Sequence, residues 1–317
     1  MSIGVLVDAM SYAKTNCFIH QLLSSISDTG EKIEFYDWRW LRRSNLVKNY
    51  KSNSLRRHDF IIVICRQRVI SQEFMRILEF LGEVPVVIYD QDPWNAYWDD
   101  YNTKGIYRNL IDNLNVIKFA VPSMFWADYI AKKELIRTDF VRMGMLPKYC
   151  STGLSLAERS PGLSFKGTLY DYRVATFNFL ESQGIKIKIE IGNLDYRNFL
   201  AYLSTIAIFF HDESAPLFCD GNPISRNMGM WHKDIEVASR GSFVIRDFSV
   251  ESEAYEIDSI PTIFLYKDLN EIPNLIARIQ SFTDEESKML QIKAVNQIKD
   301  RNDWSVTANS LVYPFAI

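Results

Sequence analysis

Short runs of β-branched and aromatic residues alternate with amphipathic segments along most of this chain of 317 residues. Each run suits one buried strand, and each amphipathic segment is long enough for a helix that leads back to the same sheet. This alternation is typical of α/β layers with parallel strands. In the first half we expect strands at 3–8, 32–37, 59–65, 84–90, 116–121 and 138–144, and helices at 13–28, 71–82, 104–114 and 123–134.

The texture of the chain changes near residue 150. The stretch KYCSTGLSLAERSPGLS, residues 148–164, is rich in Ser, Gly and Pro and has no apolar periodicity, which is typical of a linker. A second alternating series then begins. Its expected strands are 163–169, 185–192, 205–210, 241–247 and 262–268, and its expected helices are 171–183, 195–203, about 231–240 and about 250–256, with a further amphipathic stretch over 269–298.

The two series predict an α/β chain with two Rossmann-like, doubly wound domains that face a central cleft. The N-terminal domain is expected over residues 1–150 and the C-terminal domain over residues 151–298. A tail, residues 299–317, could pack back on the first domain. In open α/β sheets ligands bind at the carboxyl ends of the strands, so functional residues are expected directly after the predicted strands.

Composition excludes several classes of protein. The content of 47% hydrophobic and 24% charged residues is typical of a soluble globular chain. No run approaches the roughly 20 apolar residues of a membrane-spanning helix, and the N-terminal stretch MSIGVLVDAM lacks a signal core, so we expect a cytoplasmic protein. The four cysteines are scattered without C-x-x-C spacing, which favours reduced thiols over a disulfide or metal site.

Familiar enzyme and nucleic-acid signatures are also missing. There is no G-x-G-x-x-G fingerprint of a dinucleotide dehydrogenase and no G-x-S-x-G elbow of a serine hydrolase. The net charge of −3 gives no global basic footprint for nucleic acid. The segment from Arg39 to Arg57 is locally basic, so a polyanion partner is left as an alternative to a solvated surface.

The stretch VVIYDQDPWNAYWDD, residues 86–100, ends an apolar strand with two carboxylates two residues apart. Three interpretations compete for Asp90 and Asp92. The pair could hold a divalent cation on a phosphate, one of them could take a proton from an acceptor hydroxyl, or Asp90 could only cap the turn ahead of Pro93. We favour the catalytic base and leave open which carboxylate acts.

Aromatic residues and a histidine supply weaker candidates. Trp94 and Tyr97 follow the acidic pair, and aromatic faces beside carboxylates suit stacking on a sugar or base, although core packing is commoner. Both are candidate acceptor-binding residues. His211 opens the run His-Asp-Glu after an expected strand and is a candidate contact to the donor sugar, with loop polarity as the alternative.

The segment FKGTLYDYRVATFNFLESQGIKIKIEIGN, residues 165–193, joins a strand to a helix through a glycine. Gly167 would let the backbone approach a phosphate, and the next helix N-terminus offers free N–H groups. Lys166 and Arg173 could supply counter-charge. Further along, a predicted helix carries Lys233 and Glu236 and leads through Gly241 into the next strand.

At these residues the sequence resembles the C-terminal nucleotide-sugar domain of GT-B-fold glycosyltransferases. It looks most like the group-1 and spore-maturation (CgeB-like) branch, and its layout is similar to that of the phage DNA glucosyltransferases. In these families a strand–glycine–basic–helix unit holds the donor diphosphate, and a basic-x-x-Glu helix holds phosphate and ribose. The resemblance covers about residues 160–280 and implies that Glu236 accepts from ribose while Lys233 and Arg173 face the diphosphate.

The sequence departs from the group-1 pattern at one place. A glutamate usually precedes the ribose glutamate by seven or eight residues, whereas the stretch from Asn227 to Met230 keeps a glycine but has no carboxylate. Retention or inversion at the sugar is therefore left open. A surface role for each residue taken singly, with Glu236 on a solvated helix face, is the plain alternative.

We therefore predict a hexosyltransferase-type glycosyltransferase that uses a nucleoside-diphosphate sugar, such as a UDP-sugar, and a hydroxyl acceptor. Lys166, Arg173, Lys233 and Arg226 would hold the diphosphate charge, so no cofactor and no metal are expected. Three alternatives stay open: a phage-type enzyme that modifies DNA, a non-catalytic nucleotide-binding module, and a metal-dependent GT-A transferase that uses Asp90 and Asp92. Base, sugar, acceptor and oligomeric state are not encoded in any motif identified above.

Overall fold

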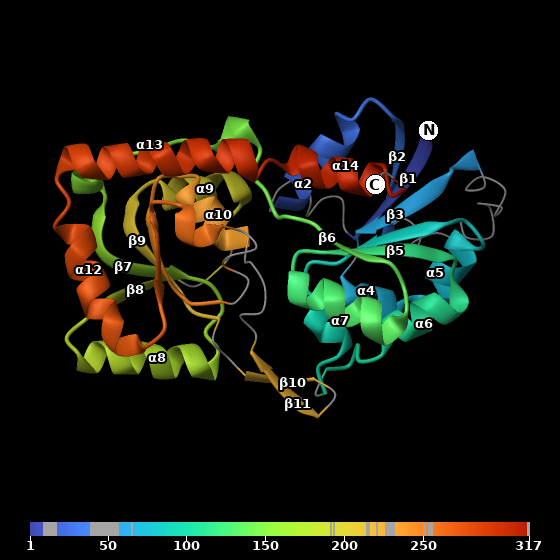
Figure 1. Cartoon of the computed structure of the whole chain (residues 1–317), viewed down its shortest axis with the longest axis horizontal. Coiled ribbons are helices and arrows are strands. Elements are labelled where there is room, and N and C mark those ends of the chain that lie inside the picture. The colour runs from blue at the N-terminus through green and yellow to red at the C-terminus, as the bar shows by residue number, and fades with distance from the viewer. Residues whose placement is uncertain are drawn as a thin grey trace. The chain divides into compact units, whose positions relative to one another are not determined.

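The computed structural model describes most of the chain and divides it into two compact units. Unit 1 contains Met1–Arg142, Pro216–Ile224 and Trp304–Ile317, and unit 2 contains Met143–Ala215 and Ser225–Asp303. The described residues are 1–8, 18–38, 57–64, 66–99, 101–190, 192, 194–213, 216–219, 221–225, 232–249, 252 and 256–315. Figure 1 shows both units.

Unit 1 is built on a parallel sheet of six strands in the order β2-β1-β3-β4-β5-β6. The strands are β1 (Ser2–Val7), β2 (Lys32–Asp37), β3 (Phe60–Ile64), β4 (Val86–Tyr89), β5 (Val116–Val121) and β6 (Thr138–Phe140). The helices are α2 (Phe18–Ser27), α4 (Gln67–Gln72), α5 (Phe74–Leu81), α6 (Ile106–Asn113), α7 (Met124–Glu134) and α14 (Trp304–Val312). All residues of β3 and β4 are buried, as expected for parallel strands covered on both faces.

Unit 2 repeats this plan with a parallel sheet of five strands in the order β13-β12-β9-β7-β8. The strands are β7 (Ser160–Lys166), β8 (Ile187–Glu190), β9 (Ile206–His211), β12 (Phe243–Asp247) and β13 (Ile263–Tyr266). The helices are α8 (Asp171–Ser182), α9 (Tyr196–Leu203), α10 (His232–Ala238), α12 (Ile272–Gln280) and α13 (Asp284–Arg301).

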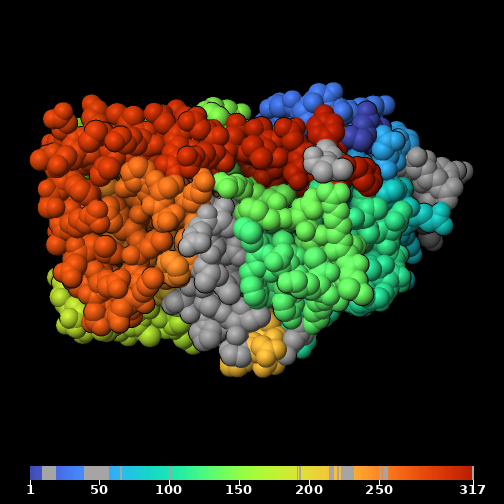
Figure 2. Space-filling model, viewed as in Figure 1, coloured from blue at the N-terminus to red at the C-terminus, as the bar shows by residue number. Residues whose placement is uncertain are grey.

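Helix α13 buries one face, on which residues recur at helical spacing, and it packs with α10. Ser287, Gln291, Ala294, Val295 and Ile298 form the buried face of α13, while the residues between them are mostly exposed. Figure 2 shows the outer side of α13 along one border of unit 2. Thr283 caps this helix in a capping box with Glu286. In unit 1, Ser123 Oγ accepts from the Trp126 N–H at 3.0 Å and caps α7.

Most of the predicted strands and helices are confirmed, and their order confirms the α/β, doubly wound class. A hairpin and a C-terminal helix were not predicted. The strands β10 (Pro216–Cys219) and β11 (Asn222–Ser225) form a separate two-stranded sheet. This hairpin belongs to unit 1, where the Asp99 N–H donates to the Phe218 carbonyl at 2.9 Å and the Gly221 N–H donates to Asp99 Oδ2 at 2.9 Å.

The second element is α14, which lies in the predicted tail and packs with α2 in unit 1. Lys118 Nζ donates to the Ser310 carbonyl at 3.0 Å, and Thr307 donates to the Arg142 carbonyl. The predicted linear division at residue 150 gives no place to the hairpin, because residues 216–224 return to unit 1. Within the described residues no helix has the length and apolar content to cross a membrane.

Candidate active site

The strand orders place a topological switch point in each sheet. In unit 2 the chain begins at β7 and then adds β8 on one side and β9 on the other. At such a point the loops after the central strands diverge and leave room for a ligand at the carboxyl edge. Lys166 ends β7 and His211 ends β9, so two predicted donor-binding residues flank the switch point of unit 2.

Two lysines at this edge each donate to a main-chain oxygen and lie over an aromatic ring, Tyr202 for Lys166 and Phe199 for Lys233. Lys166 Nζ donates to the Gly192 carbonyl at 3.0 Å, and Lys233 Nζ donates to the Lys166 carbonyl at 3.1 Å. Burial, together with the charges of Arg173 and Lys166, holds the pKa of Lys233 below its ordinary value, against the opposing effect of Glu236 and Glu213. A bound anion would relieve this repulsion, because it adds further negative charge beside the cations.

Arg173 lies in the first turn of α8 with 5% of its surface exposed. Its Nε donates to the Asp212 carbonyl at 3.0 Å, and its Nη1 donates to the Thr168 carbonyl at 2.8 Å. Its Nη2 forms an ion pair with Glu213. A guanidinium has five N–H donors in a fixed fork, so these contacts orient Arg173 without using every donor.

His211 links Arg173 to helix α10 through a buried chain of charges. Its Nε2 donates to Glu213 Oε1 at 3.2 Å, and its Nδ1 donates to Asp234 Oδ1 at 2.6 Å. Asp234 also forms an ion pair with Arg246, which is completely buried. Burial alone would lower the pKa of His211, but Asp234 and Glu213 outweigh it and raise the pKa above its ordinary value.

This chain of charges alternates in sign from Arg173 through Glu213, His211 and Asp234 to Arg246. Burial would raise the pKa of Asp234, yet Arg246 and His211 hold it below its ordinary value. The sequence predicted His211 as a donor contact. Both of its ring nitrogens are instead held by carboxylates, so its contacts are those of a buried link between elements.

Glu236 lies one helical turn after His232 on α10, with 5% of its surface exposed. His232 Nδ1 is 3.1 Å from Glu236 Oε1, and His232 Nε2 donates to the Gly144 carbonyl at 2.8 Å. Lys233 and Glu236 therefore share one short helix beside Lys166 and Arg173, rather than separate surfaces. Arg226, the fourth predicted diphosphate ligand, lies outside the described residues.

Gly167 has a packing reason that the sequence did not reveal. A Cβ added at this position would lie 3.0 Å from Phe165 Cζ, closer than side chains normally approach. The Phe165 ring in turn carries the Arg173 guanidinium, whose Cζ lies 5.3 Å from the ring centroid. Gly167 thus gives Phe165 the room to support Arg173 by a cation–π contact.

In unit 1, Asp90 follows β4 and is surrounded by neutral donors. Its Oδ2 accepts from Gln67 Nε2 at 2.7 Å and from the Tyr107 hydroxyl at 2.8 Å, and its Oδ1 accepts from the Asp92 N–H at 2.8 Å. Burial raises the pKa of Asp90, and these three hydrogen bonds offset only part of the increase. Asp90 therefore holds the turn after β4, as expected from the turn-capping interpretation.

Asp92 differs from its neighbour in exposure. Its side chain is half-buried, and it precedes a 3₁₀ turn over Pro93–Ala96 without capping it. Asp90 fixes the Asp92 main chain through the N–H contact, and Gln67 Nε2 donates to the Asp92 carbonyl at 3.1 Å. Of the two carboxylates, Asp92 is the one with an accessible side chain on a fixed main chain.

The two predicted acceptor-binding aromatics are buried. Tyr97 is 2% exposed, its hydroxyl donates to Glu134 Oε1 at 3.0 Å, and its ring stacks on Trp126 with the centroids 5.8 Å apart. Trp94 is also buried. Trp98 and Tyr101 are half-buried and stack with their centroids 5.2 Å apart, so they are the more accessible aromatics of this loop.

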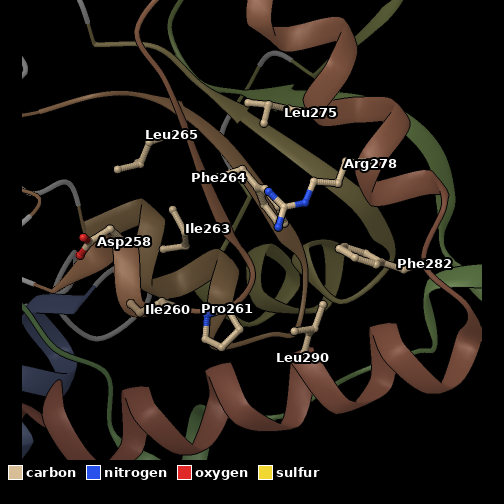
Figure 3. A pocket seen from close by; sticks show the side chains of 10 residues that line it. All are labelled: Asp258, Ile260, Pro261, Ile263, Phe264, Leu265, Leu275, Arg278, Phe282 and Leu290. Atoms are coloured by element: carbon tan, nitrogen blue, oxygen red, sulfur yellow. The ribbon is translucent and has the colours of Figure 1, made fainter.

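A cavity of about 500 Å³ in unit 2 is separate from these residues (Figure 3). It lies along the edge strand β13, where Arg278 extends from α12 toward Phe264 with its Cζ 5.2 Å from the ring centroid. None of the predicted donor-binding residues that the structure describes lines it. The lining residues are Asp258, Ile260, Pro261, Ile263, Phe264, Leu265, Leu275, Arg278, Phe282 and Leu290.

Sequence reasoning missed Asp234, Arg246, Gln67 and Tyr107. A signal existed for Arg246, because a charged residue inside the apolar strand FVIRD must find a buried partner. No comparable signal existed for Gln67 or Tyr107, which are ordinary helix residues in sequence. Their role depends on the tertiary position of Asp90.

Comparisons with known proteins identify the fold class. No known sequence family matches the chain, and no curated protein matches it. The structure nevertheless has the fold of GT-B glycosyltransferases, with two Rossmann-like units. This confirms the predicted fold class, and the single-domain GT-A alternative does not fit it.

Three solved structures illustrate the likeness. Sucrose-phosphate synthase from Thermosynechococcus elongatus is 10% identical, with 99% of this chain and 98% of that chain covered and a TM-score of 0.65. HepE of Anabaena in complex with UDP-glucose is 11% identical, with 99% of both chains covered and a TM-score of 0.62. The DNA-modifying enzyme β-glucosyltransferase is 10% identical, with 98% of this chain and 99% of that chain covered and a TM-score of 0.59. At these identities the likeness shows the fold.

Proposed function

We propose that this chain is a glycosyltransferase that moves a sugar from a nucleoside-diphosphate donor to a hydroxyl acceptor. The observation that carries the proposal is the gathering of Lys166, Arg173 and Lys233 beside Glu236 at the switch point of unit 2. Ligands of open α/β sheets bind at this edge. HepE, which has the same fold, was solved with UDP-glucose, so a UDP-hexose is the first donor to test.

Each residue has a defined part in the proposed transfer. Lys166, Lys233 and the remaining donors of Arg173 hold the diphosphate and stabilise its charge as it leaves. Glu236 accepts from a ribose hydroxyl. The bond from the sugar C1 to the diphosphate breaks, a bond from C1 to the acceptor oxygen forms, and the acceptor proton passes to Asp92. Asp90 positions Asp92 and stays out of the chemistry.

Fixed side-chain cations offset the diphosphate charge in this mechanism, so we propose that no metal ion is required. Transfer or donor hydrolysis is expected to persist after treatment with EDTA. A loss of activity that added Mg²⁺ or Mn²⁺ restores would show that a metal takes part.

A nucleotide screen tests the proposal directly. UDP, GDP and TDP are each added to the full chain, and the melting temperature is measured. A ligand at about 100 times its Kd stabilises the protein by about 2.7 kcal/mol, which is easily resolved. The proposal fails if none of the three raises the melting temperature.

Matched lysine variants connect binding to the site. Lys166→Met removes the charge and keeps the apolar stem, and it is expected to weaken nucleotide binding by about tenfold or more, the scale of one charge-assisted contact. Lys186→Met is the control, because Lys186 is an exposed lysine of the same unit. Equal affinities for the two variants would remove Lys166 from the donor site.

Turnover separates an enzyme from a nucleotide-binding module. Slow donor hydrolysis that is lost in Glu236→Ala and Asp92→Asn would support catalysis at the proposed groups. A chain that binds nucleotide but never releases sugar from any UDP-, GDP- or TDP-hexose would be a binding module.

DNA modification is a second candidate because one structure of the same fold is a DNA-modifying glucosyltransferase. The basic segment from Arg39 to Arg57 could track phosphates, although residues 39–56 lie outside the described part. Binding to duplex DNA should then weaken steeply between 50 and 200 mM salt. Salt-independent or absent binding would favour a glycan or lipid-linked acceptor.

A further inference from the structure

We propose that His211 is a positioning residue that couples the diphosphate-holding Arg173 to the ribose-holding helix α10, through Glu213 on one side and Asp234 on the other. This inference rests on the proposed function, because it concerns how the same donor site is held together. It assigns His211 a role different from the direct donor contact expected from the sequence.

The first half of the link joins His211 to the diphosphate side. Glu213 Oε1 accepts from His211 Nε2 at 3.2 Å and also pairs with Arg173. The Tyr172 hydroxyl donates to Glu213 Oε2 at 3.2 Å, and the Glu213 N–H donates to Asp247 Oδ1 at 3.0 Å. Glu213 is thus fixed on every side, and a change at His211 reaches Arg173 through one shared carboxylate.

The second half joins His211 to the ribose side. Asp234 stands between Lys233 and Glu236 on α10 and is completely buried. It has two cationic partners, His211 and Arg246. Because Lys233 and Glu236 are carried by the same helix, the contacts of Asp234 determine how both side chains are presented.

The proton on His211 is what joins the two halves. With both ring nitrogens protonated, the imidazolium donates to both carboxylates and neutralises their mutual repulsion. Loss of one proton leaves one carboxylate without its donor and both without the intervening charge. The titratable and charged groups that face His211 are Glu213 after β9, Asp234 on α10, and Arg246 and Asp247 on β12.

The pH dependence of nucleotide binding gives the first test. The probe is whichever of UDP, GDP and TDP stabilises the chain most, and its Kd is measured by calorimetry between pH 6 and pH 9. Binding by the native chain should weaken as His211 loses its proton, which occurs above the ordinary histidine value because its neighbours raise the pKa. His211→Gln should bind about tenfold more weakly at pH 6, and the part of the pH dependence that comes from His211 should be gone, while the part that comes from Lys233 remains.

A matched variant controls for general loss of structure. His58 is also a buried histidine, but it lies in unit 1 and contacts Ser2 and Tyr36. His58→Gln should lower the melting temperature and leave both the nucleotide affinity and its pH profile unchanged. The proposal is overturned if His211→Gln keeps the native pH profile, or if the two variants weaken binding equally.

Coupling itself is tested with a mutant cycle. Arg173→Lys and Glu236→Gln are measured singly and together, first with His211 present and then in His211→Gln. With His211 present, the double variant should raise the Kd by less than the two single fold-changes multiplied together. The difference should be at least about threefold, which is the size expected for linked residues. In the His211→Gln background the two losses should multiply independently. Equal coupling in both backgrounds would overturn the proposal.

A second variant keeps the test valid if His211→Gln does not fold. Asp234→Asn removes one of the two carboxylates and leaves His211 in place. It should lower the His211 pKa and shift the weakening of nucleotide binding to lower pH. An unshifted profile would overturn the proposal, whereas failure of the native chain to bind any nucleotide would remove the proposed function and this inference with it.

Discussion

Asp90 in unit 1 and Asp234 in unit 2 are the same residue type, and both are buried near the carboxyl edge of a parallel sheet. Their pKa values move in opposite directions. Burial raises the pKa of Asp90, whose partners are neutral donors, while Arg246 and His211 reverse the effect of burial and lower the pKa of Asp234. The identity of the partners, rather than burial, decides whether a buried carboxylate is held as a charge.

The two units therefore hold their buried carboxylates in different ways at the carboxyl edges of their sheets. Unit 1 fixes one carboxylate with hydrogen bonds from Gln67, Tyr107 and a main-chain N–H. Unit 2 fixes its carboxylates in a chain of alternating charges that ends at two arginines. Removing one member should consequently cost more in unit 2 than in unit 1.

The largest effect is expected from Arg246→Leu. The variant leaves Asp234 buried without one of its two cations, and breaking a buried ion pair on one side typically costs about 3–5 kcal/mol of unfolding free energy. Urea denaturation measures the loss. Adding Asp234→Asn to the same chain should recover part of it. A cost below about 1 kcal/mol would contradict the importance of the pair.

A smaller effect is expected from Asp90→Ala. The variant leaves three donors without their acceptor, and unsatisfied buried groups cost about 1–3 kcal/mol each before relaxation, so we expect a loss of about 2–3 kcal/mol. Asp92→Asn keeps its shape at a half-exposed position and should cost less than about 0.5 kcal/mol while it removes transfer activity. Similar stability losses for both variants would break the proposed division of roles.

The pH response should separate the units further. His211 has a raised pKa in the folded chain. Its contribution to stability is therefore complete below pH 6.5, the ordinary pKa of histidine, and is lost as the pH rises through the pKa of the folded state. Asp234 has a lowered pKa in the folded chain. Its contribution to stability is therefore complete above pH 3.8, the ordinary pKa of aspartate, and is lost as the pH falls through the pKa of the folded state. Asp90 has a raised pKa, and its cost of burial is instead relieved as the pH falls.

Hydrogen exchange measured by mass spectrometry, corrected for intrinsic rates, can follow each unit. From pH 6 to pH 9 the protected amides of unit 2 should lose more stability than those of unit 1. Equal changes in both units would show that His211 does not govern the stability of its network.

The smallest effect comes from helix caps, where the units should not differ. Ser123→Ala in unit 1 and Thr283→Ala in unit 2 each remove a side-chain acceptor from a helix N-terminus. Each is expected to cost about 1 kcal/mol in chemical denaturation. A large difference between them would mean that something beyond local capping separates the two units.

Much of the fold could be predicted because its signals are local. The apolar run 116–121 became β5 with the same bounds, and the segment 195–203 became α9 with a shift of one residue. The hairpin and α14 were missed for different reasons. The hairpin has a signal in the Asp-Gly pair at 220–221, which is independent of apolar alternation, while α14 follows a long helix and lacks a strong break.

The site could be predicted only at the level of residue types at strand ends. Lys166, Arg173, Lys233 and Glu236 do gather at one edge, because the doubly wound order brings β7 and β9 together. Which carboxylates flank His211 could not be read from sequence, since Asp234 is distant along the chain. The burial of Tyr97 also depends on Trp126 and Glu134, which are about 30 residues away or more.

The return of the hairpin to unit 1 has a consequence for how the chain can be divided. The polypeptide passes between the units after Arg142, Ala215, Ile224 and Asp303, so no single cleavage yields two complete pieces. A fragment that starts at Met143 would carry a hairpin whose partner, Asp99, has been left behind. Cutting the chain once near Arg142 should therefore give a nicked protein whose two fragments elute together in size-exclusion chromatography, rather than two proteins that separate.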